Sequence, residues 1–135
     1  DVCSSDLGSV EFAGQVARDQ LPGLYARAHA LVFPALRDSG GSALLEAMAR
    51  GVPVICLDWG GPGEMVDANC GVKIPVRDRA ETVAGLAAAM ARLQALPALR
   101  RSLARAARER ALDHFRWEAK ARLLDQTYQR LLAAS

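Results

Sequence analysis

The sequence predicts an α/β fold in which helices flank a parallel β-sheet. Two short apolar runs, "ALVFP" at residues 30–34 and "PVICLD" at residues 53–58, have the length and uniform hydrophobicity of strands that are buried on both faces. A glycine-rich turn and a segment with helical periodicity follow each run. Because strands that alternate with helices are joined by right-handed crossovers, this order indicates one parallel sheet with helices packed on it.

The elements of the N-terminal half follow from changes in the spacing of apolar residues. "VEFAGQV", residues 10–16, alternates apolar with small or polar residues, as a short strand that runs into a loop does. Residues 21–28 repeat apolar positions every three or four residues, which predicts a short helix with Pro22 in its first turn. "SALLEAMAR", residues 42–50, predicts a second helix that Gly51 ends.

The C-terminal half is predicted to be mostly helical. "WGGPGEMV", residues 59–66, is a second glycine-rich turn that leads into a short helix, and "GVKIPV", residues 71–76, is a last, weaker strand. Three helices are expected after Arg79, at residues 80–96, 98–112 and 117–132. The apolar face expected for the first of them consists of Val83, Leu86, Ala87 and Met90.

Composition limits the classes of protein to consider. A chain of 135 residues with 51% hydrophobic residues is long enough for one domain with its own core. A net charge of +2, with arginines dispersed among acids, is not the basic surface of a nucleic-acid-binding protein, so we expect no nucleic-acid partner. The three cysteines show no CxxC spacing, so neither a disulfide framework nor a metal site is expected. Without a long apolar run or a leader, the chain is expected to be cytoplasmic, with peripheral membrane association of a longer parent left open.

The first seven residues, "DVCSSDL", are expected not to belong to the protein. One reverse translation of them matches the tail of a sequencing adapter, and the native sequence would then begin near Gly8. We therefore divide the chain into non-native residues 1–7 and a single partial domain at residues 8–135.

The stretch "DSGGSALLE", residues 38–46, predicts a phosphate-binding turn. Gly40 and Gly41 lie between the strand that ends at Phe33 and the helix that begins near Ser42, at the edge of a parallel sheet where ligands bind. The backbone amides of these glycines and the positive end of the helix dipole favour an anion there. The dipole contributes only about 0.3–1 kcal/mol, so a multiply charged diphosphate that accepts several amide hydrogen bonds fits better than a carboxylate.

Two acids flank this turn, and they predict that the ligand carries hydroxyl groups. Glu46 lies four residues into the helix, close enough to accept hydrogen bonds from two neighbouring hydroxyls of a sugar. Asp38 stands eight positions earlier, on the loop. Because two carboxylates would repel a nucleotide unless both contact hydroxyls, the pattern indicates a ligand with a sugar at each end.

These residues resemble a known family. The segment "LYARAHALVFPALRDSGGSALLEAMARGVPVICLDWGGPGEMV" looks like the nucleotide-binding half of retaining, metal-independent glycosyltransferases with the GT-B fold, carbohydrate-active family 4. The family pattern has two acids eight positions apart, then "EAMA.G.PV" and then "GG..E". The positions that fit it are residues 38, 46, 47–49, 51, 53, 54, 60, 61 and 64. The resemblance extends over residues 10–132 and implies a Rossmann-like parallel sheet with a helical C-terminus.

The resemblance also implies roles for individual residues. Glu46 would bind the ribose hydroxyls of the donor nucleotide, and Asp38, where the family usually has glutamate, would contact the donor sugar; these two are the expected catalytic residues. The expected ligand-binding residues are Gly40, Gly41, Ser42, Glu46 and, where the family's loop reaches the nucleobase, Val16 with Gly14 and Gln15. Glu64 and the pair Gly60 and Gly61 would shape the second turn. No metal and no cofactor is implied, since the nucleoside diphosphate sugar is itself a substrate.

The family pattern contains parts that this sequence lacks. It implies an N-terminal acceptor-binding GT-B domain as a partner, and an acceptor that is a saccharide or a lipid-linked molecule, so the fragment alone is expected to be inactive. The family's sheet order, 3-2-1-4-5-6, places the strand at residues 10–13 at an edge, separated from the strand at residue 31 by two missing strands. We expect residues 10–13 either to pair with a non-native neighbour or to be displaced with apolar surface exposed.

Two other functions are compatible with parts of the sequence. A dinucleotide-dependent oxidoreductase shares the strand, glycine turn and helix, but no GxGxxG motif follows a strand here. A non-catalytic interaction module would use the arginines of residues 100–110 to contact nucleic acid or an anionic membrane. Glu109 and Asp113 balance this arginine face, which favours a solvated helix surface over that function.

Overall fold

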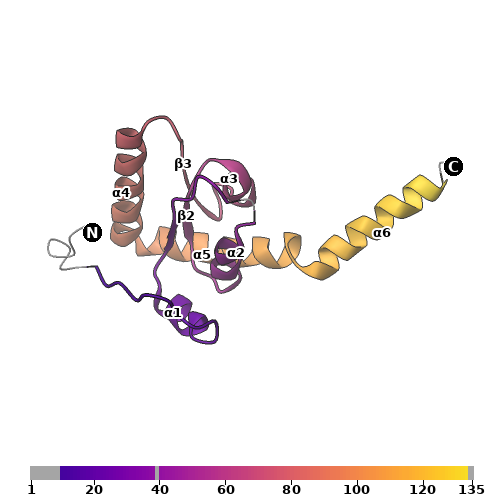
Figure 1. Cartoon of the computed structure of the whole chain (residues 1–135), viewed down its shortest axis with the longest axis horizontal. Coiled ribbons are helices and arrows are strands. Elements are labelled where there is room, and N and C mark those ends of the chain that lie inside the picture. The colour runs from indigo at the N-terminus through magenta and orange to yellow at the C-terminus, as the bar shows by residue number, and fades with distance from the viewer. Residues whose placement is uncertain (1–9, 39, 134–135) are drawn as a thin grey trace.

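The computed structural model describes residues 10–38 and 40–133 of the chain. In chain order the elements are α1 (Leu21–Arg27), β1 (Leu31–Phe33), α2 (Ser42–Ala49), β2 (Val54–Leu57), α3 (Gly60–Met65), β3 (Gly71–Ile74), α4 (Arg79–Ala95), α5 (Pro97–His114) and α6 (Trp117–Ala133). Figure 1 shows helices packed around a small sheet, with α6 extending away from it. The α/β fold with a helical C-terminus is confirmed, whereas the interpretation of residues 1–7 lies outside the described residues.

The sheet consists of three parallel strands in the order β1-β2-β3. Leu31 is paired with Val54, and Val54 is in turn paired with Gly71. Every residue of the central strand β2 is buried, as its uniform hydrophobicity predicts. The same expectation is wrong for β1, whose three residues are half-buried, because β1 pairs with β2 on one side and has no second strand beside it among the described residues.

The core lies on both faces of β2. On one face, Cys56 packs with Leu44 and Met48 of α2. On the other face, Ile55 packs with Leu93 of α4. Helix α5 contributes to both clusters, through Ala107 and Ala111 to the first and through Leu103 to the second. This single helix therefore closes the core on both faces.

Residues 10–16 do not form the predicted strand. The structure shows irregular backbone there, and the side chains of Val10 and Phe12 are 49% and 73% exposed. A strand needs a neighbour to accept its backbone hydrogen bonds, and these residues have none among those the structure describes. Of the two outcomes expected for this segment, displacement with exposed apolar surface is the one observed.

Helix α4 turns a different face to the sheet from the one predicted. Ala89 and Leu93 are buried and Leu86 packs beside them, whereas Val83 and Met90 are exposed. The helix is rich in alanine, so its apolar residues do not define a single face. Contact with β2 and β3 decides which side is buried, and the sequence of the helix alone does not specify that contact.

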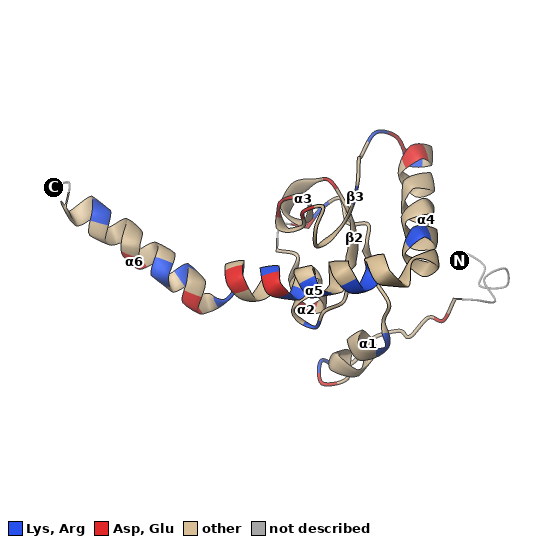
Figure 2. Ribbon diagram, turned by 180° about the vertical axis from the view of Figure 1, so that it is seen from behind, with Lys and Arg blue, Asp and Glu red and all other residues tan. Residues whose placement is uncertain are grey.

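The C-terminal helix α6 packs against little of the rest. None of its described residues is buried, and Trp117 is 86% exposed. Charged residues of both signs are distributed along α5 and α6 (Figure 2). No single helix in residues 10–38 and 40–133 has the length and apolar composition of a membrane span, although α4 and α5 meet both requirements together across their 104° bend.

The segment that follows α3 is organised around the carboxylate of Asp67. Its Oδ1 accepts the backbone N–H of Asn69 at 2.9 Å and of Cys70 at 3.2 Å, and its Oδ2 lies 2.9 Å from Nη1 of Arg110. Burial alone would raise the pKa of Asp67. The hydrogen bonds from Asn69 and Cys70 and the charge of Arg110 outweigh burial and lower this pKa.

Substitution of two methionines should show where the core lies. Met48 is fully buried in α2, whereas Met90 is 45% exposed on α4. Met48→Ala should lower the free energy of unfolding by about 2–5 kcal/mol through lost burial and a cavity. The matched variant Met90→Ala should change it by roughly 0.5 kcal/mol or less. Urea unfolding measures both, and equal effects would contradict the packing described above.

Asp67 should stabilise the fold in a pH-dependent way. Because its pKa is lower in the folded state, its contribution is complete above the unfolded pKa of about 3.9 and is lost as the pH falls through the folded value. The difference in unfolding free energy between wild type and Asp67→Asn should therefore be constant from about pH 5 to 7 and shrink below about pH 4. Asp125→Asn, on the exposed helix α6, is the matched control in urea unfolding at each pH. A difference that stays constant to about pH 2 would contradict this assignment.

Candidate functional site

Two glycine-containing turns meet at the carboxyl ends of the strands. The first joins β1 to α2 and includes Gly40 and Gly41, and the second joins β2 to α3, which begins at Gly60. A Cβ atom on Gly60 would lie 3.8 Å from the carbonyl oxygen of Asp38, so the two turns are in close contact. Ligands of open parallel sheets bind at this edge, where loops and helix N-termini converge.

Asp38 closes the first turn with its own side chain. Its Oδ1 accepts the backbone N–H of Gly40 at 2.8 Å and of Gly41 at 2.7 Å. The two amides that the sequence predicts to bind a ligand therefore bind Asp38 in this structure. Helix geometry leaves the next amides, those of Ser42 and Ala43, without an intrahelical acceptor. An anion at the start of α2 would be held by these amides and by the helix dipole.

Gly41 occupies a position that no other residue fits without strain. Its φ of +50° lies in the left-handed region, and a Cβ there would come within 2.9 Å of Sδ of Met65. Gly41 also begins α2, because its carbonyl accepts the N–H of Leu45 at 3.0 Å. The glycine at this position is thus explained by backbone conformation and by crowding from α3.

Glu46 lies one turn into α2 and is half-buried beside Tyr25 of α1 and Arg50. The hydroxyl of Tyr25 donates to the carbonyl of Ala43 at 3.2 Å, and Nη1 of Arg50 donates to the carbonyl of Glu46 at 3.1 Å. Burial raises the pKa of Tyr25, and the charge of Glu46 raises it further, while Arg50 lowers it. The guanidinium carbon of Arg50 lies 5.3 Å from the centre of the Tyr25 ring.

Sequence reasoning missed both of these neighbours of Glu46. Arg50 stands four residues after Glu46, at the C-terminal cap of α2, a spacing that signals contact. Tyr25 approaches from α1, and no local pattern in the sequence indicates that contact.

Most of the predicted site residues lie together at the start of α2, whereas Val16 lies elsewhere. Asp38, Gly40, Gly41, Ser42 and Glu46 all lie on the turn or on the first two turns of α2. Val16 instead lines a hollow of about 430 Å³ beside α1, and none of those five residues lines that hollow. The other residues that line it are Gln20, Gly23, Leu24 and Arg27.

Side chains from strand β3 and from helix α5 bond to the backbone of helix α3. Nζ of Lys73 lies 2.8 Å from Oδ1 of Asp58 and donates to the carbonyl of Gly63 at 3.1 Å. Nε of Arg110 donates to the carbonyl of Met65 at 2.7 Å. Burial raises the pKa of Cys56 to about 11, which keeps it a thiol, and this thiol lies 3.7 Å from the carbonyl of Pro62. Neither Lys73 nor Arg110 was predicted to hold α3: Arg110 was considered only as part of an arginine surface on its helix, and a lysine in an apolar strand was the available signal for Lys73.

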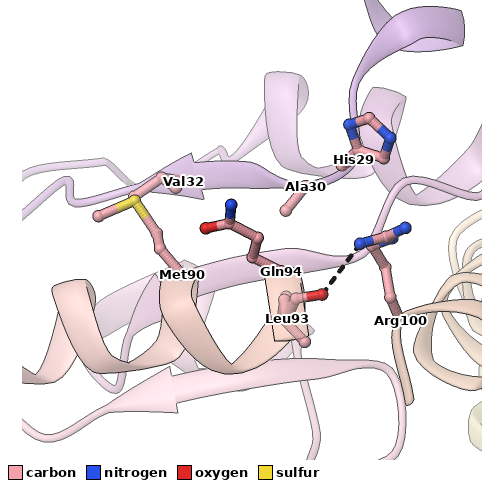
Figure 3. A pocket seen from close by; sticks show the side chains of 7 residues that line it. All are labelled: His29, Ala30, Val32, Met90, Leu93, Gln94 and Arg100. Atoms are coloured by element: carbon pink, nitrogen blue, oxygen red, sulfur yellow. Dashed lines mark hydrogen bonds between the residues drawn. The ribbon is translucent and has the colours of Figure 1, made fainter. Parts of the chain in front are cut away.

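A separate hollow lies between β1, α4 and α5, away from the glycine turns (Figure 3). It has a volume of about 450 Å³, and Nη1 of Arg100 at its rim donates to the carbonyl of Leu93 at 3.0 Å. The residues that line it are His29, Ala30, Val32, Met90, Leu93, Gln94 and Arg100, none of which is a predicted site residue. Within residues 10–38 and 40–133, no group of three His, Cys, Asp or Glu side chains is placed to hold a metal ion.

Alanine substitution of the two neighbouring glycines should change the free energy of unfolding differently. Gly41→Ala should lower the free energy of unfolding by about 1–2 kcal/mol, because alanine strains a left-handed residue. A Cβ on Gly40 would meet nothing closer than Asp38 Oδ1 at 4.0 Å, so a methyl group has room there. Gly40→Ala should therefore be neutral or slightly stabilising. Urea unfolding of both variants measures this, and equal destabilisation would show that the turn differs from the one described.

Comparison with known proteins places this geometry in a family. The family described as "Glycosyl transferases group 1" matches residues 6–110. Glycogen synthase of Mycobacterium tuberculosis (strain CDC 1551 / Oshkosh) is 37% identical over 123 residues, which cover 90% of this chain and 29% of that protein. D-inositol 3-phosphate glycosyltransferase of Streptomyces bingchenggensis is 31% identical over 120 residues, covering 88% and 25% of the two chains.

A solved structure agrees with the sequence comparison. Sucrose-phosphate synthase from Thermosynechococcus elongatus superimposes with a TM-score of 0.78 and 37% identity, over 96% of this chain and 32% of that one. The chain thus spans between a quarter and a third of the length of these proteins. The match to the GT-B fold confirms the predicted Rossmann-like sheet, and we conclude that the chain belongs to the glycosyl transferases of group 1.

Proposed function

We propose that this chain is the donor-binding part of a retaining glycosyltransferase. The enzyme would move a sugar from a nucleoside diphosphate sugar to an acceptor. The observation that carries the proposal is the turn at the start of α2. There the left-handed Gly41 and the carboxylate of Asp38 expose the first helical amides, and Glu46 lies one turn further on. Membership of the group 1 family supports sugar transfer as the reaction class.

The diphosphate would bind at the amides of Ser42 and Ala43. These amides lie at the positive end of α2, and the Ser42 side chain is exposed. Asp38 supplies one oxygen to the turn, and its Oδ2 has no partner among the described residues. This second oxygen can accept a hydrogen bond from a hydroxyl of the donor sugar. The proposed role of Asp38 is therefore double, since it shapes the turn and contacts the sugar.

Glu46 would bind the ribose of the donor. Its carboxylate stays close to the phosphate site because α2 is anchored at this point by Tyr25, which bonds the Ala43 carbonyl. Glu46 is half-buried, and a carboxylate can accept two hydroxyl hydrogen bonds through its two oxygens. Val16 lies apart from the other proposed site residues, beside α1, so its proposed contact with the nucleobase, together with Gly14 and Gln15, would require the ligand to extend from α2 toward α1. The proposal involves no metal or cofactor.

Transfer would need an acceptor-binding domain as partner, with a saccharide or a lipid-linked molecule as acceptor in the cytoplasm. The names of the three similar proteins differ in what they act on or make, so they favour no single acceptor. Asp38 and Glu46 would contact the donor, and this chain alone would bind the donor without transferring its sugar.

Glu46 gives the sharpest test of this proposal. Glu46→Ala should weaken binding of a nucleoside diphosphate sugar by roughly 10- to 100-fold, which corresponds to the loss of about 1.5–3 kcal/mol from hydrogen bonds to a charged group. The measurement is calorimetric titration of UDP-, ADP- and GDP-sugars into the longest natural polypeptide that contains this chain. Glu118→Ala, an exposed glutamate of α6, is the matched control. Unchanged affinity in Glu46→Ala would remove Glu46 from the site, and no binding of any nucleotide sugar by the wild type would refute the proposal.

A further inference from the structure

Arg110 of α5 places its whole guanidinium group at the C-terminal end of α3. Nε donates to the carbonyl of Met65 at 2.7 Å, Nη2 donates to the carbonyl of Glu64 at 3.4 Å, and Nη1 lies 2.9 Å from Oδ2 of Asp67. The last carbonyls of a helix have no intrahelical donors, so Arg110 satisfies groups that would otherwise depend on water. The Arg110 side chain is 26% exposed, so these bonds are partly shielded from solvent.

The other end of this contact is the turn at Gly41. The side chain of Met65 covers Gly41, because a Cβ on Gly41 would lie 2.9 Å from Sδ and 3.5 Å from Cε of Met65. The backbone of Met65 is bound to Arg110, and its side chain is packed on the residue that begins α2. A continuous path of contacts therefore runs from α5 through Met65 to the candidate site.

The position of α3 depends on such contacts because the helix is too short to be stable by itself. It has six residues, three of which are glycines. Lys73 bonds the carbonyl of Gly63 from β3, so the middle of α3 stays attached even without Arg110. What Arg110 adds is the placement of the last residue, Met65, against the turn.

We propose that Arg110 is a positioning residue for the donor site. By holding the Met65 carbonyl it keeps the Met65 side chain against Gly41, and this contact maintains the left-handed turn that exposes the amides of Ser42 and Ala43. The identity of the ligand at these amides rests on the function proposed above. The planar guanidinium group reaches two carbonyls and a carboxylate through three separate nitrogens, whereas a lysine would have to reach all three from a single nitrogen.

The test compares two arginines of one helix. Arg110→Gln removes the contacts described here, whereas Arg108→Gln changes an exposed arginine two residues away that has no acidic partner among the described residues. In the full chain labelled with ¹⁵N-glycine, Arg110→Gln should shift the amide resonances of Gly40 and Gly41, and Arg108→Gln should leave them in place. In the longest natural polypeptide, Arg110→Gln should weaken nucleotide-sugar binding on the order of 10-fold. Arg110→Lys should recover part of that loss.

Met65→Ala provides a second route to the same result. It leaves the backbone carbonyl that Arg110 binds but removes the side chain that touches Gly41, so it should weaken binding to a similar extent. This variant decides the matter if Arg110→Gln does not fold.

Two outcomes would overturn the role of Arg110, and a third would refute the proposed function. Unchanged glycine resonances in folded Arg110→Gln would overturn the proposal. Unchanged donor affinity in Arg110→Gln or Met65→Ala, with a wild type that binds, would overturn it as well. A wild type that binds no nucleotide sugar would instead refute the proposed function and, with it, the role of Arg110 toward a donor.

Discussion

The turn at Gly41 satisfies several constraints at a single residue. Its N–H is bound by Asp38, its carbonyl accepts the first helical hydrogen bond from Leu45, and its Cα surface is covered by Met65. Gly41 makes all three contacts in the left-handed conformation at φ +50°, which costs other residues about 1–2 kcal/mol. The direction of α2, and so the position of Glu46, follows from this one backbone geometry.

Helix α5 holds the elements on either side of that turn in place. Helix α5 packs on α2 through Ala107 and Ala111, and Arg110, on the same turn of α5, reaches the end of α3. The two helices that begin at the candidate site are thus fixed by the same helix, which also contributes Leu103 to the core cluster that contains Ile55 of β2. A displacement of α5 would move both glycine turns together, because no loop separates its two contacts.

Features that depend on neighbouring residues in the sequence were predictable, and features that depend on distant partners were not. The strand at Val54–Leu57 and the helix after Gly41 follow from an apolar run and from helical spacing. The burial of β1 and of one face of α4 depends on which elements lie beside them, so those predictions were wrong. In the site, Asp38 and Glu46 were named from their spacing. The bonds of Asp38 to Gly40 and Gly41 were not, since they require the conformation of the turn.

The charge of Asp38 decides how a diphosphate and a sugar would lie at this turn. Two like unit charges about 5 Å apart repel by roughly 3 kcal/mol at an effective dielectric constant of about 20, more than the helix dipole returns. Oδ1 of Asp38 already takes the amides of Gly40 and Gly41. A phosphate is therefore best placed on the axis of α2, at Ser42 and Ala43, and the hydroxyl-bearing part of the ligand is best placed beside Asp38. The acid would thus orient the proposed ligand through repulsion as well as through hydrogen bonding.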